Sequence, residues 1–307
     1  MKIYDLKTLQ ECELDSETVV ALGTFDGCHA GHMSVIRSAY LKAKSLKTKS
    51  VVYTFDKIPK SSSDSEIKSI LTIDEKIKFI RKCGLDYIAI DSFDLIKDYE
   101  GDFFISEVLR KKLKANCCAC GYNYRFGKNA KYTGESLKEF FKNDGECVDI
   151  CGKVSINNED ISSTLIREKI KNGDVEQILA YSPPYSVYSQ VTEGKKLGRT
   201  IGIPTINQQI PYEKITPKNG VYITECEIGE DVYPAITNVG VRPTVVSYGK
   251  ENMETYIIGY SGNLYYSYIR VNFYKKIRDE KRFSSLEELK NQIQLDIKKA
   301  KDYFNIK

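Results

Sequence analysis

The chain has 307 residues, but it contains only two histidines and no long apolar run. Residues 1–15, MKIYDLKTLQECELD, lack the apolar core of a secretory signal peptide. No uninterrupted apolar stretch approaches the roughly 20 residues that a membrane-spanning helix needs. These absences argue against a secreted or membrane-inserted protein. We therefore expect a cytoplasmic protein with no membrane partner.

A strong excess of charge of either sign is also lacking. The chain carries 46 basic and 42 acidic side chains, which gives a formal charge of +4. Because the lysines alternate with acidic residues, they indicate solvated surfaces, and we expect no nucleic-acid partner. The small positive net charge is equally compatible with the binding of small polyanionic molecules. With 41% hydrophobic residues the chain can bury a substantial core, and its length predicts two domains.

The cysteines do not form a pattern typical of a disulfide framework, because there are nine of them at irregular spacing. Five gather in two segments: Cys117, Cys118, Cys120, Cys147 and Cys151. A zinc site is one interpretation. However, residues 114–121 read as a buried strand, whose alternate side chains face opposite ways, so Cys117 and Cys120 would diverge. We therefore expect reduced core thiols and keep zinc as the alternative.

Both histidines lie in one decapeptide, residues 23–32, which reads GTFDGCHAGH. His29 and His32 follow an apolar run and precede a helical pattern. The start of such a helix attracts anions through its unpaired backbone N–H groups. Imidazoles there can stabilise the charge that develops during in-line displacement at a phosphate. The alternative is two ordinary surface or core histidines. We predict that His29 and His32 are catalytic and that the nucleotide is bound by Gly23, Phe25, Asp26 and Gly27.

Residues 17 to about 180 alternate apolar runs with amphipathic helical patterns, which is typical of parallel βαβ units. Expected strands cover residues 18–23, 50–55, 87–91, 116–121 and 146–151. Expected helices run from after His32 to about residue 45, and over residues 74–83, 101–113 and 135–141. Ligands bind at the carboxyl ends of such strands, where the decapeptide begins. The polar segment 57–69 is a surface loop or a flap over the nucleotide.

Two later segments supply further phosphate-binding candidates. Residues 121–127, GYNYRFG, follow the fourth expected strand and contribute Asn123 and Arg125, whose guanidinium can contact phosphate. Residues 161–167, ISSTLIR, open a helix near an anion-attracting end. This segment contributes Ser162, Ser163 and Thr164 as nucleotide-binding residues and Arg167 as a catalytic residue.

A domain boundary is predicted at Ser182-Pro183-Pro184, because a helix cannot continue through paired prolines. Beyond it, tyrosines and β-branched residues alternate, which predicts antiparallel strands closing into a small barrel. Residues 261–263, Ser-Gly-Asn, read as a hairpin turn. A final helix is expected after a cap at Ser284 or Ser285. Its apolar stripe comprises Leu286, Leu289, Ile293, Ile297, Ala300 and Phe304.

A second nucleotide site is indicated by residues 194–207, GKKLGRTIGIPTIN. Its glycines permit close approach of the backbone to a phosphate. Thr205 and Asn207 offer oxygens on one face of a strand, where they can hold hydrated Mg²⁺. Glu254 is a candidate base for a hydroxyl, or else a solvated strand residue. The predicted nucleotide-binding residues are Gly194, Lys195, Gly202, Pro204, Thr205 and Asn207.

The ordered series GRTIGIPTIN, GVY, TNVGVRPT, METY and RDEKRFSSLEEL resembles the riboflavin kinase module. Together with H-x-G-H, RFG and SST-x-IR, the chain from about residue 17 onward resembles the bacterial bifunctional riboflavin kinase and FAD synthetase family. The resemblance implies a Rossmann-like adenylyltransferase domain with a parallel sheet, residues 1–181. It also implies a riboflavin kinase barrel closed by a helix, residues 182–307.

This resemblance implies two reactions. The barrel would transfer the γ-phosphoryl group of ATP to riboflavin, which gives FMN. The α/β domain would transfer AMP from a second ATP to FMN, which gives FAD and pyrophosphate. ATP would be the co-substrate, Mg²⁺ the cofactor, and FMN and FAD product ligands, in a monomer or weak homo-oligomer.

Residue roles carry over by motif position. Thr205 and Asn207 correspond to the magnesium and ATP residues, Glu254 to the base, and His29 and His32 to the α-phosphate pair. The serine-threonine-arginine segment corresponds to the second phosphate-binding element. Flavin contacts are expected from Asn238, Arg242 and Arg278.

Four positions depart from the family pattern. Ile58 stands where F-x-P-H-P has histidine, and Asn123 replaces an aspartate. Leu165 replaces a frequent arginine, and Tyr256 a histidine. Three of the four lie in the adenylyltransferase domain. The alternative function is therefore a riboflavin kinase whose N-terminal domain is weakened or regulatory.

Overall fold

A computed structural model describes residues 1–6, 14, 16–58, 67–142, 147–194, 197–241 and 251–306. It divides into two compact units, residues 1–163 and 164–307. Helix α6 (Ser163–Asn172) therefore groups mainly with the second unit. The predicted boundary at residue 182 remains a prediction about where the two activities divide.

The first unit is built on a six-stranded sheet in the order β1-β4-β3-β2-β5-β8, with every pair parallel. The strands are β1 (Lys2–Asp5), β2 (Thr18–Leu22), β3 (Lys49–Phe55), β4 (Tyr87–Asp91), β5 (Ala115–Gly121) and β8 (Cys147–Cys151). The predicted parallel sheet is confirmed. Strand β1 was not predicted, because it is a short, largely exposed edge strand without an apolar run.

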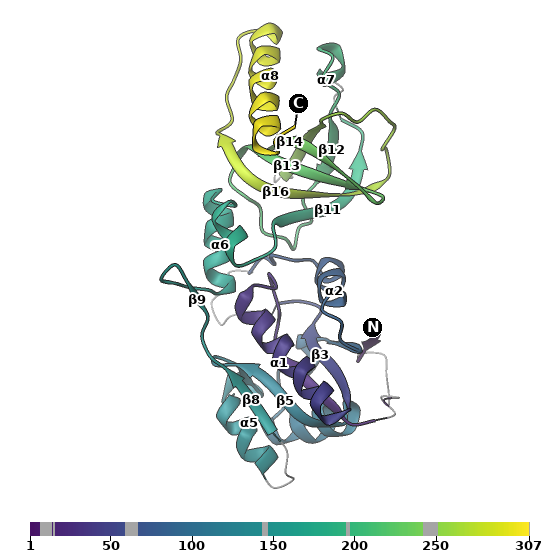
Figure 1. Ribbon diagram of the computed structural model, residues 1–307, viewed down its shortest axis with the longest axis vertical. Coiled ribbons are helices and arrows are strands. Elements are labelled where there is room, and N and C mark those ends of the chain that lie inside the picture. The colour runs from purple at the N-terminus through teal and green to yellow at the C-terminus, as the bar shows by residue number, and fades with distance from the viewer. Residues whose placement is uncertain are drawn as a thin grey trace. The chain divides into compact units, whose positions relative to one another are not determined.

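Helices cover the sheet. They are α1 (Ala30–Leu46), α2 (Ile73–Arg81), α3 (Phe93–Ile96), α4 (Gly101–Phe103), the π-helix η1 (Phe104–Lys112) and α5 (Gly134–Phe141). Helix α1 packs against β2, β3 and β5 (Figure 1). The predicted helix over residues 101–113 is present as α4 followed by η1, and the chain winds into a π-helix after Phe103.

Short elements connect these parts. Strands β6 (Arg125–Phe126) and β7 (Tyr132–Thr133) pair around the turn η2 (Lys128–Ala130). Strands β9 (Ser155–Ile156) and β10 (Glu159–Asp160) form a second small ribbon. Most of the expected flap, residues 59–66, lies outside the described residues.

The prediction that all cysteines are reduced thiols is wrong, because Cys117 and Cys147 form a disulfide. They are register partners on the parallel strands β5 and β8, with Cα atoms 4.8 Å apart. Sequence spacing hides this pairing, since 30 residues separate them. Cys120 is a free buried thiol, and burial raises its pKa to about 12. Among the described residues, no group of three or more His, Cys, Asp or Glu side chains is placed to hold a metal ion.

The second unit contains a closed barrel in the order β11-β12-β15-β14-β13-β16, which confirms the predicted antiparallel barrel. Its strands are β11 (Tyr185–Thr192), β12 (Ile206–Gln209), β13 (Gly220–Ile228), β14 (Asp231–Val241), β15 (Glu251–Ile257) and β16 (Tyr268–Arg278). Helices α6, η4 (Gln177–Ala180) and α7 (Leu197–Thr200) accompany them.

The predicted hairpin at residues 261–263 is wrong, because this segment connects β15 to β16, which are not neighbours in the barrel. The tight hairpin instead joins β13 to β14, where Ile228 and Asp231 pair across a two-residue turn at Gly229 and Glu230. Glycine suits this turn because Gly229 has a φ of 65°.

The final helix is α8 (Leu286–Tyr303), and it packs on the barrel as predicted (Figure 1). Its N-cap is Ser285, whose hydroxyl accepts the Glu288 N–H at 3.1 Å. Ile297 and Ala300 are buried against Ile223 and Ile236 of the barrel. Leu286 does not belong to the stripe, since its first-turn position leaves it 53% exposed.

Candidate active sites

The turn between β2 and α1 holds the histidine pair. Phe25, Gly27 and Cys28 adopt left-handed conformations, with φ of 50°, 89° and 43°, and together they bend the chain sharply into the helix. His29 is the N-cap of α1, where its Nδ1 accepts the His32 N–H at 3.4 Å. Because Nδ1 is an acceptor, neutral His29 carries its proton on Nε2. That proton is a donor at an anion-attracting helix end.

The structure brings both histidines together as predicted. Their rings stack with centroids 3.7 Å apart and planes inclined by 23°. His29 is buried and His32 is half-buried. The rings of Phe25 and His32 meet edge to face, with their centroids 5.5 Å apart. Two imidazoles and the first backbone N–H groups of α1 thus converge at the carboxyl end of β2. This arrangement suits a phosphate group.

Asp26, a predicted nucleotide-binding residue, is hydrogen-bonded within the protein. Its carboxylate is 1% exposed and accepts the Ile70 N–H at 3.0 and 3.1 Å and the Leu71 N–H at 3.0 Å. Its backbone carbonyl accepts the Ser163 hydroxyl at 2.7 Å. Asp26 therefore joins three segments of the first unit.

Lys76 is a residue that the sequence analysis missed. Its side chain is buried on α2, and its Nζ donates to the Phe55 carbonyl at 3.0 Å and the Thr54 hydroxyl at 3.3 Å. Burial lowers its pKa, and the nearby charge of Asp26 partly opposes this. The signal in the sequence is a lysine three residues after Ile73 and four before Ile80, on the apolar face of the helix.

The other predicted residues of this site are placed as follows. Asn123 and Arg125 are exposed after the carboxyl end of β5, and the flanking Tyr124 and Phe126 rings stack at 5.8 Å. Ser163 begins α6 beside Asp26. The remaining members are half-buried or exposed: Ser162, Thr164 and Arg167.

In the barrel, three predicted residues lie in one row across neighbouring strands. Asn207 of β12 pairs with Glu254 of β15, which pairs with Asn238 of β14. Residues directly opposite in an antiparallel sheet share a face, so an amide, a carboxylate and an amide are adjacent. Asn207 is 5% exposed, whereas Glu254 is exposed. The row places an accessible carboxylate beside a buried amide.

The glycine-rich loop folds tightly onto Asn207 and Thr205. A Cβ at Gly194 would overlap the Asn207 amide, and one at Gly198 would overlap the Ile203 carbonyl and approach the Thr205 hydroxyl. Gly202 has a φ of 76°, which favours glycine. Pro204 is exposed and Thr205 half-buried, just before β12. Lys195 lies outside the described residues.

Two of the three residues predicted to contact the flavin are hydrogen-bonded to acidic side chains. Asn238 donates to Glu280 at 3.3 Å, and Arg278 Nε donates to the buried Asp296 carboxylate at 2.8 Å. The Arg278 guanidinium also lies 5.8 Å from the centre of the Phe283 ring. Arg242 lies outside the described residues, so the flavin contacts stay predictions.

Two family models of known proteins match this chain. The FAD synthetase family model matches residues 11–165, and the riboflavin kinase model matches residues 181–304. The chain belongs to the bifunctional riboflavin kinase/FMN adenylyltransferase family. The relative of that name from Haemophilus influenzae is 30% identical over 306 residues, which cover 97% of this chain and 96% of the relative. The Bacillus subtilis relative is 30% identical over 95% of this chain and 94% of its own.

A solved structure has the same architecture. It is a Streptococcus pneumoniae protein described as a macrolide-efflux protein, with 28% identity and a TM-score of 0.85. The match covers 96% of this chain and 97% of that one. Within the described part of the present chain, none of the helices has the length and apolar character needed to cross a membrane.

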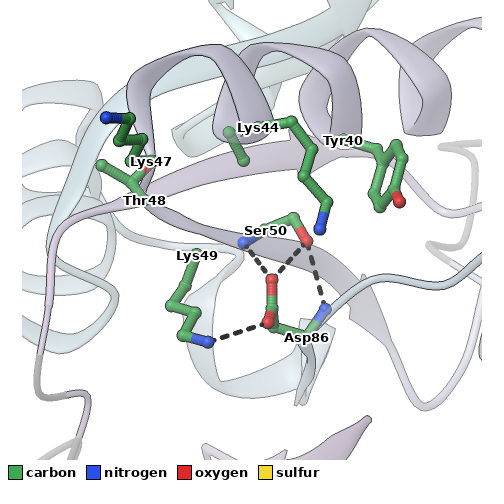
Figure 2. A pocket seen from close by; sticks show the side chains of 8 residues that line it. Tyr40, Lys44, Lys47, Thr48, Lys49, Ser50 and Asp86 are labelled. Atoms are coloured by element: carbon green, nitrogen blue, oxygen red, sulfur yellow. Dashed lines mark hydrogen bonds and ion pairs between the residues drawn. The ribbon is translucent and has the colours of Figure 1, made fainter.

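A hollow of about 280 Å³ lies at the amino-terminal ends of strands β3 and β4, opposite to the strand ends that carry the histidines (Figure 2). It is lined where α1 ends and β3 begins, by Tyr40, Ala43, Lys44, Lys47, Thr48, Lys49, Ser50 and Asp86. Asp86 accepts the Ser50 N–H at 3.0 Å, the Ser50 hydroxyl at 2.8 Å and the Lys49 ammonium at 3.1 Å. Lys44 and Lys47 lie where cations stabilise the helix C-terminus, so these charges have a structural explanation.

Proposed function

We propose that this chain makes FAD from riboflavin in two steps, each in its own unit. The observation that carries the proposal is the presence of two separate polar sets, each within the span of the matching family model. The stacked histidines lie at the helix start of the first unit, and the row from Asn207 to Asn238 lies on the barrel. The barrel phosphorylates riboflavin to FMN, and the first unit adenylylates FMN.

In the adenylyl step, the FMN phosphate attacks the α-phosphorus of ATP and pyrophosphate leaves. Negative charge on the α-phosphate oxygens is stabilised by the Nε2–H of His29, by His32 and by the N-terminus of α1. Arg125 and Ser162 hold the remaining phosphates. The protein forms no covalent bond, so its contribution is alignment and charge stabilisation.

In the kinase step, Glu254 accepts the proton of the riboflavin hydroxyl as that oxygen attacks the γ-phosphorus of ATP and ADP leaves. An exposed carboxylate at the middle of the row is accessible to such a substrate. Thr205 and Asn207 provide a hydroxyl and an amide oxygen, which suit a hydrated Mg²⁺, and they would hold that ion. The ion would neutralise phosphate charge when bound. Asn238, Arg242 and Arg278 bind the flavin.

The alternative function, a kinase with a weakened or regulatory N-terminal domain, is favoured by the departures from the family pattern at Ile58, Asn123 and Leu165. Ile58 follows β3 at the carboxyl edge of the sheet and offers no imidazole. The stacked histidine pair and its helix start are nevertheless complete, which favours an active adenylyl step. A missing hydrogen bond of about 1–3 kcal/mol would slow this step without abolishing it.

We infer a cytoplasmic location, because both steps consume ATP. Each polar set comes from one chain, so a monomer or weak homo-oligomer suffices. Neither set requires a nucleic acid.

The test is a time course of purified protein with riboflavin, ATP and Mg²⁺, in which FMN and FAD are separated and measured. We expect FMN to rise first and FAD to follow. FMN that accumulates without FAD would favour the regulatory alternative. An absence of both products would overturn the proposal.

A further inference from the structure

Asp26 connects the elements of the adenylyltransferase site. The residue lies in the middle of the turn between β2 and α1, three positions before His29. Its buried carboxylate accepts N–H groups of Ile70 and Leu71, directly before the N-cap Thr72 of α2. Its carbonyl accepts the hydroxyl of Ser163, the first residue of α6. One residue thus joins the histidine turn to two helix starts.

This turn needs such support. Two residues that are not glycine, Phe25 and Cys28, adopt left-handed conformations on either side of Asp26 and Gly27. Conformations of this kind persist only where the surrounding structure holds them. The hydrogen bonds that the Asp26 carboxylate accepts from Ile70 and Leu71 supply that hold, and they use both of its oxygens.

The segment that Asp26 holds is itself anchored. Thr72 and Glu75 form a reciprocal capping box at the start of α2. One turn later, Lys76 donates to Thr54 and Phe55 at the end of β3. The start of α2 is therefore fixed to the carboxyl edge of the sheet, and Asp26 transfers that fixed position to the histidine turn.

We propose that Asp26 is a positioning residue for adenylyl transfer, which sets the orientation of the His29 and His32 rings by locking their turn to the starts of α2 and α6. This inference rests on the proposed FMN adenylyltransferase activity. Asp26 acts through the histidines and contacts neither ATP nor FMN. A displacement of about 1 Å in catalytic groups can cost on the order of 100-fold in rate.

The test compares Asp26→Asn, His29→Asn and the double variant in the full chain, with FMN, ATP and Mg²⁺ at saturation. Asparagine at position 26 places an amide donor against backbone N–H donors. We expect Asp26→Asn to lower kcat for FAD formation by about 10- to 100-fold. On the His29→Asn background we expect a smaller fold-loss than on the wild-type background, because part of the effect of Asp26 acts through the His29 ring.

Two controls separate positioning from stability. Glu75→Gln removes another buried charge at the start of α2 but retains the capping box, because glutamine also serves at this position, so FAD formation should stay within 2-fold of wild type. Riboflavin kinase activity and thermal unfolding, measured for each variant, show whether the protein is folded. Asp26→Glu is a second variant at this position, which keeps the negative charge. We expect Asp26→Glu to be folded and to fall between wild type and Asp26→Asn.

Four results would overturn the proposal. The first is Asp26→Asn activity within 2-fold of wild type. The second is an equal loss on the wild-type and His29→Asn backgrounds. The third is unfolding of the first unit in both Asp26 variants, which would make Asp26 a stability residue. The fourth is a loss in Glu75→Gln as large as that in Asp26→Asn. A wild-type protein that forms no FAD would instead refute the proposed adenylyltransferase function.

Discussion

Asn207 and Glu254 are directly opposite one another on β12 and β15, and they differ sharply in exposure. Asn207 is 5% exposed and lies against Gly194, whereas Glu254 is exposed. A buried amide and an accessible carboxylate therefore lie on one face of the barrel. In the proposed kinase step, the amide would hold a ligand and the carboxylate would reach the substrate hydroxyl.

Glu254→Gln should lower riboflavin phosphorylation by about 10²- to 10⁴-fold, because an amide cannot accept the hydroxyl proton. FAD formation from supplied FMN should be unchanged. The matched control is Gln209→Ala, an exposed position on β12, which should leave both rates at the wild-type level. Initial rates with riboflavin and with FMN check this prediction. A loss of both activities in Glu254→Gln would contradict a division between the units.

Gly194→Ala should also impair the kinase, through Asn207. The added methyl group overlaps the Asn207 amide, so this side chain must move. We expect kcat with riboflavin to fall by at least 10-fold, while Gly229→Ala, in the β13–β14 turn, keeps the kinase rate. If Gly194→Ala phosphorylates riboflavin at the wild-type rate, the buried position of Asn207 is not required.

His29→Asn should lower FAD formation by about 10²- to 10³-fold and spare FMN formation. Asparagine is a favourable N-cap, so this variant retains a helix cap while it loses the imidazole. Thermal unfolding should therefore remain close to that of wild type. Product analysis with FMN as the substrate measures the effect. Undiminished FAD formation would remove His29 from the mechanism.

The disulfide should contribute to stability. Cys117 and Cys147 are separated by 30 residues, and closing a loop of that size stabilises a fold by about 3–4 kcal/mol in the chain-entropy model. Dithiothreitol should lower the thermal midpoint of wild type, whereas Cys117→Ser should unfold at the same temperature with and without reductant. Cys83→Ser, at a free thiol, should respond to reductant as wild type does. A wild-type midpoint that ignores reductant would contradict the pairing.

Asp86 should give an acid-dependent contribution to stability. Burial opposes its ionisation, but hydrogen bonds from Ser50 and Lys49 outweigh this and hold its pKa below the usual value. Because the pKa of Asp86 is lower in the folded state, its ionised carboxylate stabilises the fold at pH values above the unfolded-state pKa of about 3.9. This stabilisation is lost as the pH falls through the folded-state pKa. Asp86→Asn should cost on the order of 1 kcal/mol at pH 7, since the side chain is partly exposed.

The difference between wild type and Asp86→Asn should shrink below pH 4. Urea unfolding at pH 7 and pH 3 measures it. An equal difference at both values would show that the Asp86 charge is not the cause. FMN and FAD formation should not change, because Asp86 lies at the edge of the sheet away from the histidines.

The sequence predicted the elements whose signal is local. Strands β2 to β5 are apolar because the sheet is covered on both faces, and the decapeptide marks the end of β2. The edge strand β1 gave no such signal. The false hairpin at residues 261–263 arose because turn chemistry does not reveal which strands pair in a barrel. The π-helix after Phe103 has no local signature that separates it from an α-helix.

Within the sites, residue types were predictable but their partners were not. His29 and His32 were identified from their spacing. The uses of Asp26, Lys76 and Cys117 depend on contacts between segments distant in the sequence, and a single sequence does not encode those contacts in local patterns.

The most direct test of the two-unit account follows both ends of the ATP triphosphate in one reaction. Purified full-length protein is supplied with riboflavin, Mg²⁺ and ATP labelled at the α- or the γ-phosphorus, and FMN and FAD are separated. The account predicts γ-label in FMN and in the FAD derived from it, and α-label in FAD alone. An FAD product without α-label, or FMN without γ-label, would contradict it.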